Sequence, residues 1–378
     1  GSVPDLHKLF DFVGPLLEVD TDSASENDAY DVDEHQVYHP YLFPHDVTNH
    51  SLSAGTLTKH GSPLASYVED GERLVSRAVY LLDPISAQHR FDMYRAMRSR
   101  LNVSSRFGWG TLTLPTLISA MFQLILRSND ESLQPDNNDS VDNDAMIQFL
   151  TELLVEFSPL HEEIAVQLFC QAAVCMASST TYSNRRKLAL EYFNHAILLF
   201  EQAQSLASSR EQFSTLVNLI GCLERIQQLD GFDSETFEIL SSRMVKYACR
   251  LLTRPEQILA LCACSSLFWP SSECSVRDEE KVTSVVETAM SIADGCLSRG
   301  EQILGLIDVL VRCVYLVEKG CVRLKETGRI EQLVDSISER LERSTRKNSA
   351  VARVASSRFT RILNTMRRKA DLFGVVPA

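Results

Sequence analysis

The sequence predicts an all-α protein, built as a HEAT-like α-solenoid of antiparallel helix pairs. Apolar residues recur with a helical period through most of the 378 residues, and no segment alternates apolar and polar residues as a half-buried strand does. The pairs Glu211-Gln212, Glu256-Gln257 and Glu301-Gln302 each open a helical pattern and stand 45 residues apart. A unit of about 45 residues with two helices is typical of HEAT and armadillo repeats.

The apolar spacing predicts each helix in turn. A short amphipathic helix is expected over Asp5 to Leu17. The later helices are expected over Leu64 to Leu82, Ser86 to Leu101, Leu112 to Arg127, Ala145 to Phe157, His161 to Ala177, Asn184 to Leu206, Glu211 to Leu229, Ser234 to Leu252, Glu256 to Trp269, Asp278 to Cys296, Glu301 to Lys319, Ile330 to Leu341 and Ala350 to Ala370. The helix after Glu256-Gln257 is apolar nearly all round, as expected for a helix sandwiched between repeats.

The repeat starts also carry helix-capping signals. Ser208, Thr253 and Ser298 each precede a Glu by three residues, which is the spacing of a capping box. Pro255 lies in the first turn of its helix, where the missing N–H has no partner to lose. We therefore expect three capping boxes, one per repeat.

Two polar segments divide the chain. Residues 1–64 hold 11 acidic and 2 basic side chains, so this region is expected to be a short helix followed by an acidic linker without a core. Residues 65–378 are expected to form the solenoid, with an unstructured insert at about 128–144. Five histidines of the linker, near several carboxylates, are a weak metal-site alternative; their irregular spacing favours a solvated linker, and no metal is expected. These are His35, His39, His45, His50 and His60.

Charge and composition exclude several classes of protein. Lys and Arg number 37 against 50 Asp and Glu, giving a net charge of −13, which argues against a basic nucleic-acid-binding protein. The longest apolar stretch, Leu216 to Leu223, is far shorter than the roughly 20 residues of a spanning helix, so a soluble protein is expected. The ten cysteines lie in apolar helical segments without a Cys-x-x-Cys motif, which favours buried reduced thiols and a cytosolic protein.

No catalytic motif was found, and no cofactor is expected. His161-Glu162-Glu163 lacks the second His of a zinc-protease motif, and Gly108-Trp109-Gly110 lacks the lysine of a phosphate loop. The C-terminal region is instead basic, with ten basic residues and one acidic residue between Arg340 and Lys369. Arg346, Arg353, Arg361 and Arg368 form one stripe, which is either a solvated face or a contact with an anionic lipid or protein surface.

Short motifs give the sequence a family resemblance. Leu251-Leu252-Thr253-Arg254-Pro255-Glu256-Gln257, followed by Leu267-Phe268-Trp269, resembles the C-terminal solenoid of the vacuolar protein sorting-associated protein 35 family, the large subunit of retromer. Further similar stretches are Thr113 to Leu117, Phe169 to Ala173, the Arg312, Tyr315, Glu318 and Lys319 helix, and Phe359 to Arg368. The matches run in order from about Leu74 to Arg368.

The resemblance implies a non-enzymatic scaffold of the endosomal coat that returns cargo to the Golgi or the plasma membrane. Such a protein is cytoplasmic and peripheral on endosomal membranes. Its solenoid holds a phosphoesterase-fold subunit, vacuolar protein sorting-associated protein 29. Phe268, Trp269, Arg312 and Tyr315 are the expected partner contacts, although Phe268 is more simply core between repeats.

The resemblance also implies self-association between two large subunits. Arg250 and Arg254 stand where the family has a basic patch, and Glu201 remains of the acidic one, where Gln202 and Ala203 replace acids. Two other functions stay open from the residues: a related solenoid adaptor, such as the large subunit of retriever, and a lipid-binding helical domain that uses the basic last helix.

Overall fold

The computed structural model describes residues 63–82, 86–100, 110–131, 142–180, 182–203, 208–270, 277–345 and 350–373. All regular structure in these residues is helical, which confirms the all-α prediction. The chain divides into two compact units, Gly1–His161 and Glu162–Ala378, called unit 1 and unit 2 below. None of the described helices combines the length and the apolar composition needed to cross a membrane.

Unit 1 contains α2 (Pro63–Leu81), α3 (Ala87–Arg100), α4 (Gly110–Glu131) and α5 (Asn143–Phe157). α4 packs against the other three helices and buries Leu114, Leu117, Ile118 and Met121 completely. Glu72 of α2, itself buried, accepts hydrogen bonds from the backbone N–H groups of Leu112 and Thr113, at 2.7 and 3.0 Å. This carboxylate satisfies donors in the first turn of α4 that have no partner within the helix.

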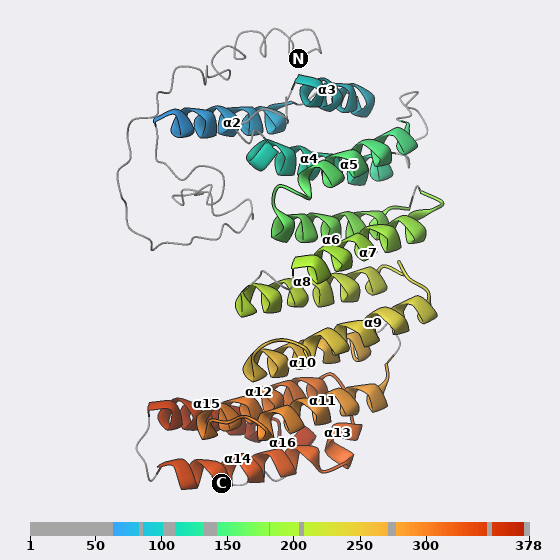
Figure 1. The fold of residues 1–378 in the computed structure, drawn as a ribbon. Coiled ribbons are helices and arrows are strands. Elements are labelled where there is room, and N and C mark those ends of the chain that lie inside the picture. Colours follow the sequence, from blue (N-terminus) through green and yellow to red (C-terminus); the bar gives the residue numbers. More distant parts are fainter. Residues whose placement is uncertain are drawn as a thin grey trace. The chain divides into compact units, whose positions relative to one another are not determined.

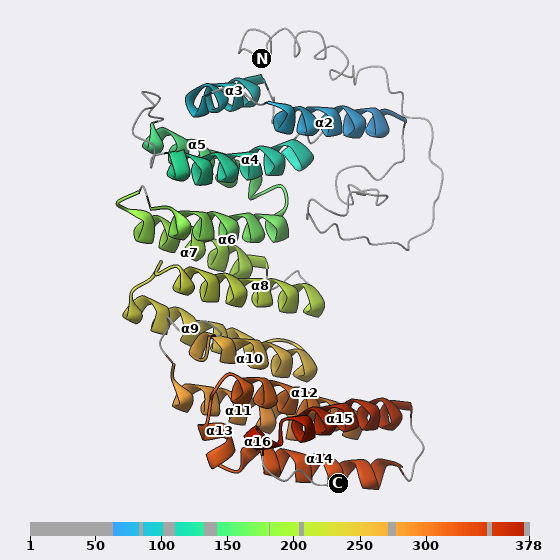
Figure 2. The ribbon, with the colours of Figure 1, turned by 180° about the vertical axis from the view of Figure 1, so that it is seen from behind.

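Unit 2 consists of the remaining helices. They are α6 (Glu162–Ser178), α7 (Arg185–Ala203), α8 (Ser209–Gln228), α9 (Ser234–Ala248), α10 (Arg254–Phe268), α11 (Glu279–Asp294), α12 (Arg299–Glu318), α13 (Arg323–Glu326), α14 (Arg329–Thr345), α15 (Ala350–Arg368) and α16 (Ala370–Phe373). Consecutive helices from α6 to α12 pack against each other and succeed one another along this unit in both ribbon views (Figures 1 and 2). This is the stacking of helix pairs that defines a solenoid.

The helix boundaries agree closely with the sequence predictions, with a few differences. α4 continues to Glu131 and α5 begins at Asn143, so both ends of the expected insert at 128–144 are helical. The short helices α13 and α16 were not predicted. The helix expected over Asp5 to Leu17, the acidic linker and its histidines lie outside the described residues.

Only one of the three predicted capping boxes forms. At α8 the Ser208 hydroxyl accepts from the Glu211 N–H, and the Glu211 carboxylate accepts from the Ser208 N–H at 2.7 Å. The prediction was wrong at Thr253 and Ser298, whose side chains make no capping hydrogen bond. The Thr253 hydroxyl donates to the Glu256 carboxylate instead, at 2.7 Å.

Two of the three repeat-start glutamines, Gln257 and Gln302, have a role that the sequence did not reveal. The Gln257 side chain donates to the Leu251 carbonyl, and the Gln302 side chain donates to the Cys296 carbonyl, both at 2.7 Å. Each bond spans six residues backward, across the loop that precedes the helix. These two glutamines therefore fix the loops that precede α10 and α12.

Candidate partner-binding face

The helices of unit 2 present two different surfaces. α6, α8, α10 and α12 form a row in which each helix packs against the next, while α7, α9 and α11 each pack against the two even-numbered helices beside them. The exposed sides of α7, α9 and α11 are called the odd face below, and those of α8, α10 and α12 the even face.

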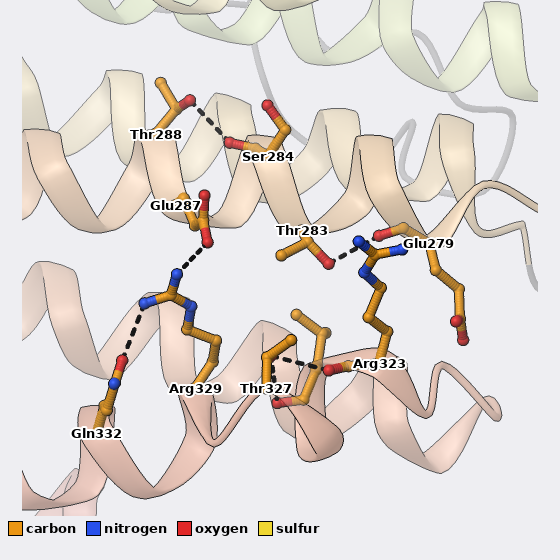
Figure 3. Close-up of polar contacts among 10 residues, drawn as sticks. Glu279, Thr283, Ser284, Glu287, Thr288, Arg323, Thr327, Arg329 and Gln332 are labelled. Atoms are coloured by element: carbon orange, nitrogen blue, oxygen red, sulfur yellow. Dashed lines mark hydrogen bonds and ion pairs between the residues drawn. The ribbon is translucent and has the colours of Figure 1, made fainter.

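Ion pairs tie successive repeats together on the odd-face side of unit 2. Each pair joins a carboxylate to a cation that lies 42 or 43 residues later. The pairs are Glu201–Arg243, Glu238–Lys281, Glu280–Arg323 and Glu287–Arg329. Figure 3 shows the last of them between α11 and α14, with Arg329 also donating to Gln332 at 3.0 Å. Pairs this exposed contribute about 0–1 kcal/mol each, so this side is a solvated, charged surface.

The even face carries fewer charges on α10 than the odd face does on α9 and α11, and its nearest carboxylates are Glu224 of α8, near Arg312, and Asp308 of α12, near Cys262. Its centre is formed by nine exposed or partly exposed residues: Asn218 and Gly221 of α8; Leu259, Cys262, Ala263 and Ser266 of α10; Val311, Arg312 and Tyr315 of α12. Leu259 and Val311 are 40% and 45% exposed. The α10 part carries only short or aliphatic side chains. Depletion of charge around exposed apolar residues is typical of the centre of a protein interface.

Arg312 and Tyr315 lie together on the even face. The Arg312 guanidinium stacks on the Tyr315 ring, 5.0 Å from its centroid, and its Nε donates to the Ser265 hydroxyl at 2.6 Å. Burial lowers the pKa of Arg312. Its Nη2 is shielded from solvent and has no hydrogen-bond acceptor among the described residues. An arginine held by an aromatic ring at the centre of a face is a typical anchor for a protein partner.

Phe268 and Trp269, the other two predicted partner contacts, are buried. Each is 6% exposed. The Trp269 indole N–H donates to the Lys319 carbonyl at 3.1 Å, and the Arg277 guanidinium lies over the indole, 5.0 Å from its centroid. These contacts join the end of α10 to the end of α12. The structure gives both residues a place in the core between repeats.

The three residues predicted for self-association lie near the loop between α9 and α10. Arg250 and Arg254 are exposed, on either side of Leu252, which is 70% exposed. Glu201 accepts hydrogen bonds from Arg243, at 2.8 Å, and from the Tyr247 hydroxyl. These hydrogen bonds, the one from Tyr247 first, lower the pKa of Glu201. Glu201 is therefore already engaged within its own chain.

Three members of the predicted arginine stripe are exposed on α15. They are Arg353, Arg361 and Arg368, while Arg346 lies outside the described residues. The opposite side of α15 is buried through Ala355, Phe359 and Met366. Two other cations of this region are used within the chain, because Arg358 pairs with Asp308 and Lys369 pairs with Glu318. The exposed stripe is thus available as a basic surface.

The nine cysteines in the described residues are free thiols. Seven of them are buried, as predicted, while Cys262 is partly exposed and Cys249 is exposed. Burial raises the pKa of Cys262 to about 12. This thiol of the even face is therefore protonated and behaves as a small apolar group.

Comparison with known families decides the relationship of the chain. The family model described as "Vps35: Vacuolar protein sorting-associated protein 35" matches residues 2–340. The chain belongs to the Vps35 family. The family resemblance inferred from the short motifs is thereby confirmed, and the stacked helix pairs agree with it.

The curated relatives include proteins of the plant Arabidopsis thaliana and of a fission yeast. Vacuolar protein sorting-associated protein 35C of Arabidopsis thaliana is 28% identical over 273 residues, covering 69% of this chain and 32% of the relative. Protein 35B of the same plant is 21% identical over 314 residues, covering 81% and 38%. Protein 35 of Schizosaccharomyces pombe is 27% identical over 163 residues, covering 42% and 18%. The chain thus spans about a third of the length of the plant relatives.

Proposed function

We propose that this chain is the solenoid part of a non-enzymatic scaffold subunit of a retromer-type endosomal coat. Its even face holds the phosphoesterase-fold subunit, vacuolar protein sorting-associated protein 29, in a coat that returns cargo from endosomes to the Golgi or the plasma membrane. The protein acts in the cytoplasm, peripherally on endosomal membranes. Membership of the Vps35 family supports this role, and the relatives are named for vacuolar protein sorting.

The observation that carries the choice of face is the contrast in charge between the two sides of unit 2. The odd face has carboxylates and cations along α9 and α11. A partner that covers them must pay the free energy of desolvating these charged groups. The even face offers Leu259 and Val311 for burial and Arg312 with Tyr315 as an anchor. Burial of aliphatic and aromatic side chains at a largely uncharged centre is what stabilises a protein–protein interface.

A pair of matched substitutions tests this assignment. Val311→Asp places a carboxylate on the even face, and Ile239→Asp places one at a comparably exposed aliphatic position of the odd face; the two native side chains are 45% and 60% exposed. Removing a partnerless carboxylate from water costs several kcal/mol, so V311D is expected to weaken binding of the phosphoesterase-fold subunit at least 100-fold. I239D is expected to co-elute with the subunit as the wild type does.

The result that overturns the proposal is equally specific. If V311D retains the subunit in gel filtration of an equimolar mixture while I239D loses it, the partner binds the odd face. If the unchanged chain does not co-elute with the subunit, the scaffold function itself is wrong. Both positions are exposed, so neither substitution is expected to unfold the chain. Circular dichroism of both variants serves as the control for folding.

A second activity, self-association, is favoured by the loop between α9 and α10. Arg250 and Arg254 flank the exposed Leu252 there, a combination of cations and apolar surface that fits an acidic patch on a second copy. We propose a homodimer contact at this loop. Replacing both arginines by Glu is expected to shift sedimentation toward the monomer; an unchanged dimer fraction contradicts the contact.

A further inference from the structure

The exposed side of α15 carries a row of cations that its own chain leaves unpaired. Arg353, Arg361 and Arg368 are exposed. Asp308 and Glu318 of α12 pair with other cations, one within α15 and one directly after it. In the part of the chain that the structure describes, the three arginines therefore remain available for an anionic group that approaches from solvent.

The apolar side of α15 is already used inside unit 2. Ala355, Phe359 and Met366 are buried, so this side cannot enter a bilayer as the apolar side of an interfacial helix does. A partner of α15 must contact the exposed side, where the arginines lie. Binding there depends on charge and is screened by salt.

The exposed side of α15 has little of what the centre of a protein interface offers. Its exposed uncharged polar residues are Ser357, Thr360 and Asn364, and the helix has no exposed aromatic residue. The exposed apolar residues are Val351 and Val354, in its first turns only. Protein interfaces have apolar and aromatic residues at their centre, so the composition of α15 disfavours an acidic protein as the partner.

The three arginines form a row and not a cluster. They lie eight and seven residues apart, which is about 12 and 10.5 Å along an α-helix. A single phosphate group is bound by donors that converge on it, and the arginines of a row do not converge. An anionic membrane surface presents many headgroups that diffuse laterally, so each arginine meets one without a fixed match.

Negative charge on the adjacent helix α14 does not cancel this row. Between Arg329 and Lys369 the chain has 11 basic and 4 acidic residues. The four acidic residues, all exposed on α14, are Glu331, Asp335, Glu339 and Glu342. Unit 2 has 27 basic and 26 acidic residues, so the net charge of −13 comes from the rest of the sequence. The α14–α15 end is therefore the positively charged part of unit 2.

We infer that the exposed side of α15 is a contact for an anionic lipid surface. The helix lies against the headgroups, and Arg353, Arg361 and Arg368 hold it there by charge attraction, without insertion of apolar residues. Each cation beside an anionic leaflet raises the partition onto it by about five-fold, so three raise it by about 100-fold. This contact goes beyond the proposed function, because it needs no bound subunit.

Charge reversal on two different faces tests the inference. The probes are sedimented vesicles of phosphatidylcholine alone and of phosphatidylcholine mixed with phosphatidylserine. Arg353→Glu with Arg361→Glu is expected to weaken binding to the phosphatidylserine vesicles by about 25-fold or more. Lys187→Glu with Lys246→Glu, on α7 and α9 of the odd face, changes the net charge equally and is expected to bind as the wild type does. All four positions are exposed, so both double variants are expected to fold.

The outcomes separate this helix from net charge and lipid from protein. Undiminished binding of the α15 variant overturns the inference, and so do equal losses in the two double variants, because the effect then follows net charge. It is also overturned if the unchanged chain binds soluble polyglutamate but not phosphatidylserine vesicles, since the partner is then an acidic protein, or if it binds neither. Co-elution with the phosphoesterase-fold subunit is measured separately, so the proposed function stands when only this inference fails.

Discussion

Replacement of Trp269 distinguishes a core residue from a partner contact. The side chain is 6% exposed, its N–H is bonded to the Lys319 carbonyl, and Arg277 covers the ring. Truncation of a buried aromatic residue to Ala costs about 3–5 kcal/mol. For a unit of this size each kcal/mol corresponds to about 2–4 °C. Trp269→Ala is therefore expected to lower the unfolding midpoint by roughly 10 °C.

Trp269→Phe separates the hydrogen bond from the packing. Phe keeps a buried ring under Arg277 but leaves the Lys319 carbonyl without the indole donor, at a cost of about 1–2 kcal/mol. Differential scanning fluorimetry of wild type, W269F and W269A is expected to give three ordered midpoints. If W269A melts within 2 °C of the wild type yet loses the phosphoesterase-fold subunit, Trp269 is an interface residue and the packing argument is refuted.

Three further predictions concern capping, pH and lipid binding. Ser208→Ala is expected to cost about 1 kcal/mol in urea denaturation, whereas Ser298→Ala, which removes no capping bond, costs almost nothing; equal effects contradict this. The Glu201 pKa is lowered in the native state, so the stability lost in Glu201→Gln is fully present above about pH 4.3 and is lost as the pH falls through the lowered native pKa. A stability difference between wild type and E201Q that does not decline on acidification contradicts the network. If the α15 stripe binds anionic lipid, phosphatidylserine vesicles are expected to sediment the chain at low salt but not at 0.5 M NaCl. The double substitution Arg353→Glu and Arg361→Glu is expected to abolish this sedimentation. Sedimentation that does not depend on salt excludes lipid binding by charge attraction.

The sequence predicted the long helices because their cores repeat with the helical period. α8, α10 and α12 begin within two residues of the Glu-Gln pairs from which their starts were predicted. α13 and α16 escaped prediction because four residues contain little more than one turn and show no period. The capping boxes were over-predicted because the Ser/Thr-x-x-Glu spacing does not fix side-chain rotamers: at Thr253 the hydroxyl turns to the Glu256 carboxylate instead of the backbone.

The candidate site was only partly predictable. The family-like helix pattern pointed to Arg312 and Tyr315, and the structure places both on the even face. The sequence pattern did not reveal that Phe268 and Trp269 are buried. Sandwiched helices are apolar on several sides, so which side is exposed depends on how distant helices stack.

Protection of introduced cysteines tests the central claim most directly. Val311→Cys reports on the even face and Ile239→Cys on the odd face, and maleimide labelling of each is measured by mass spectrometry with and without the phosphoesterase-fold subunit. The even-face assignment predicts that the saturating subunit slows labelling at position 311 at least tenfold and leaves position 239 unchanged. Slowed labelling at 239 with unchanged labelling at 311 would contradict it.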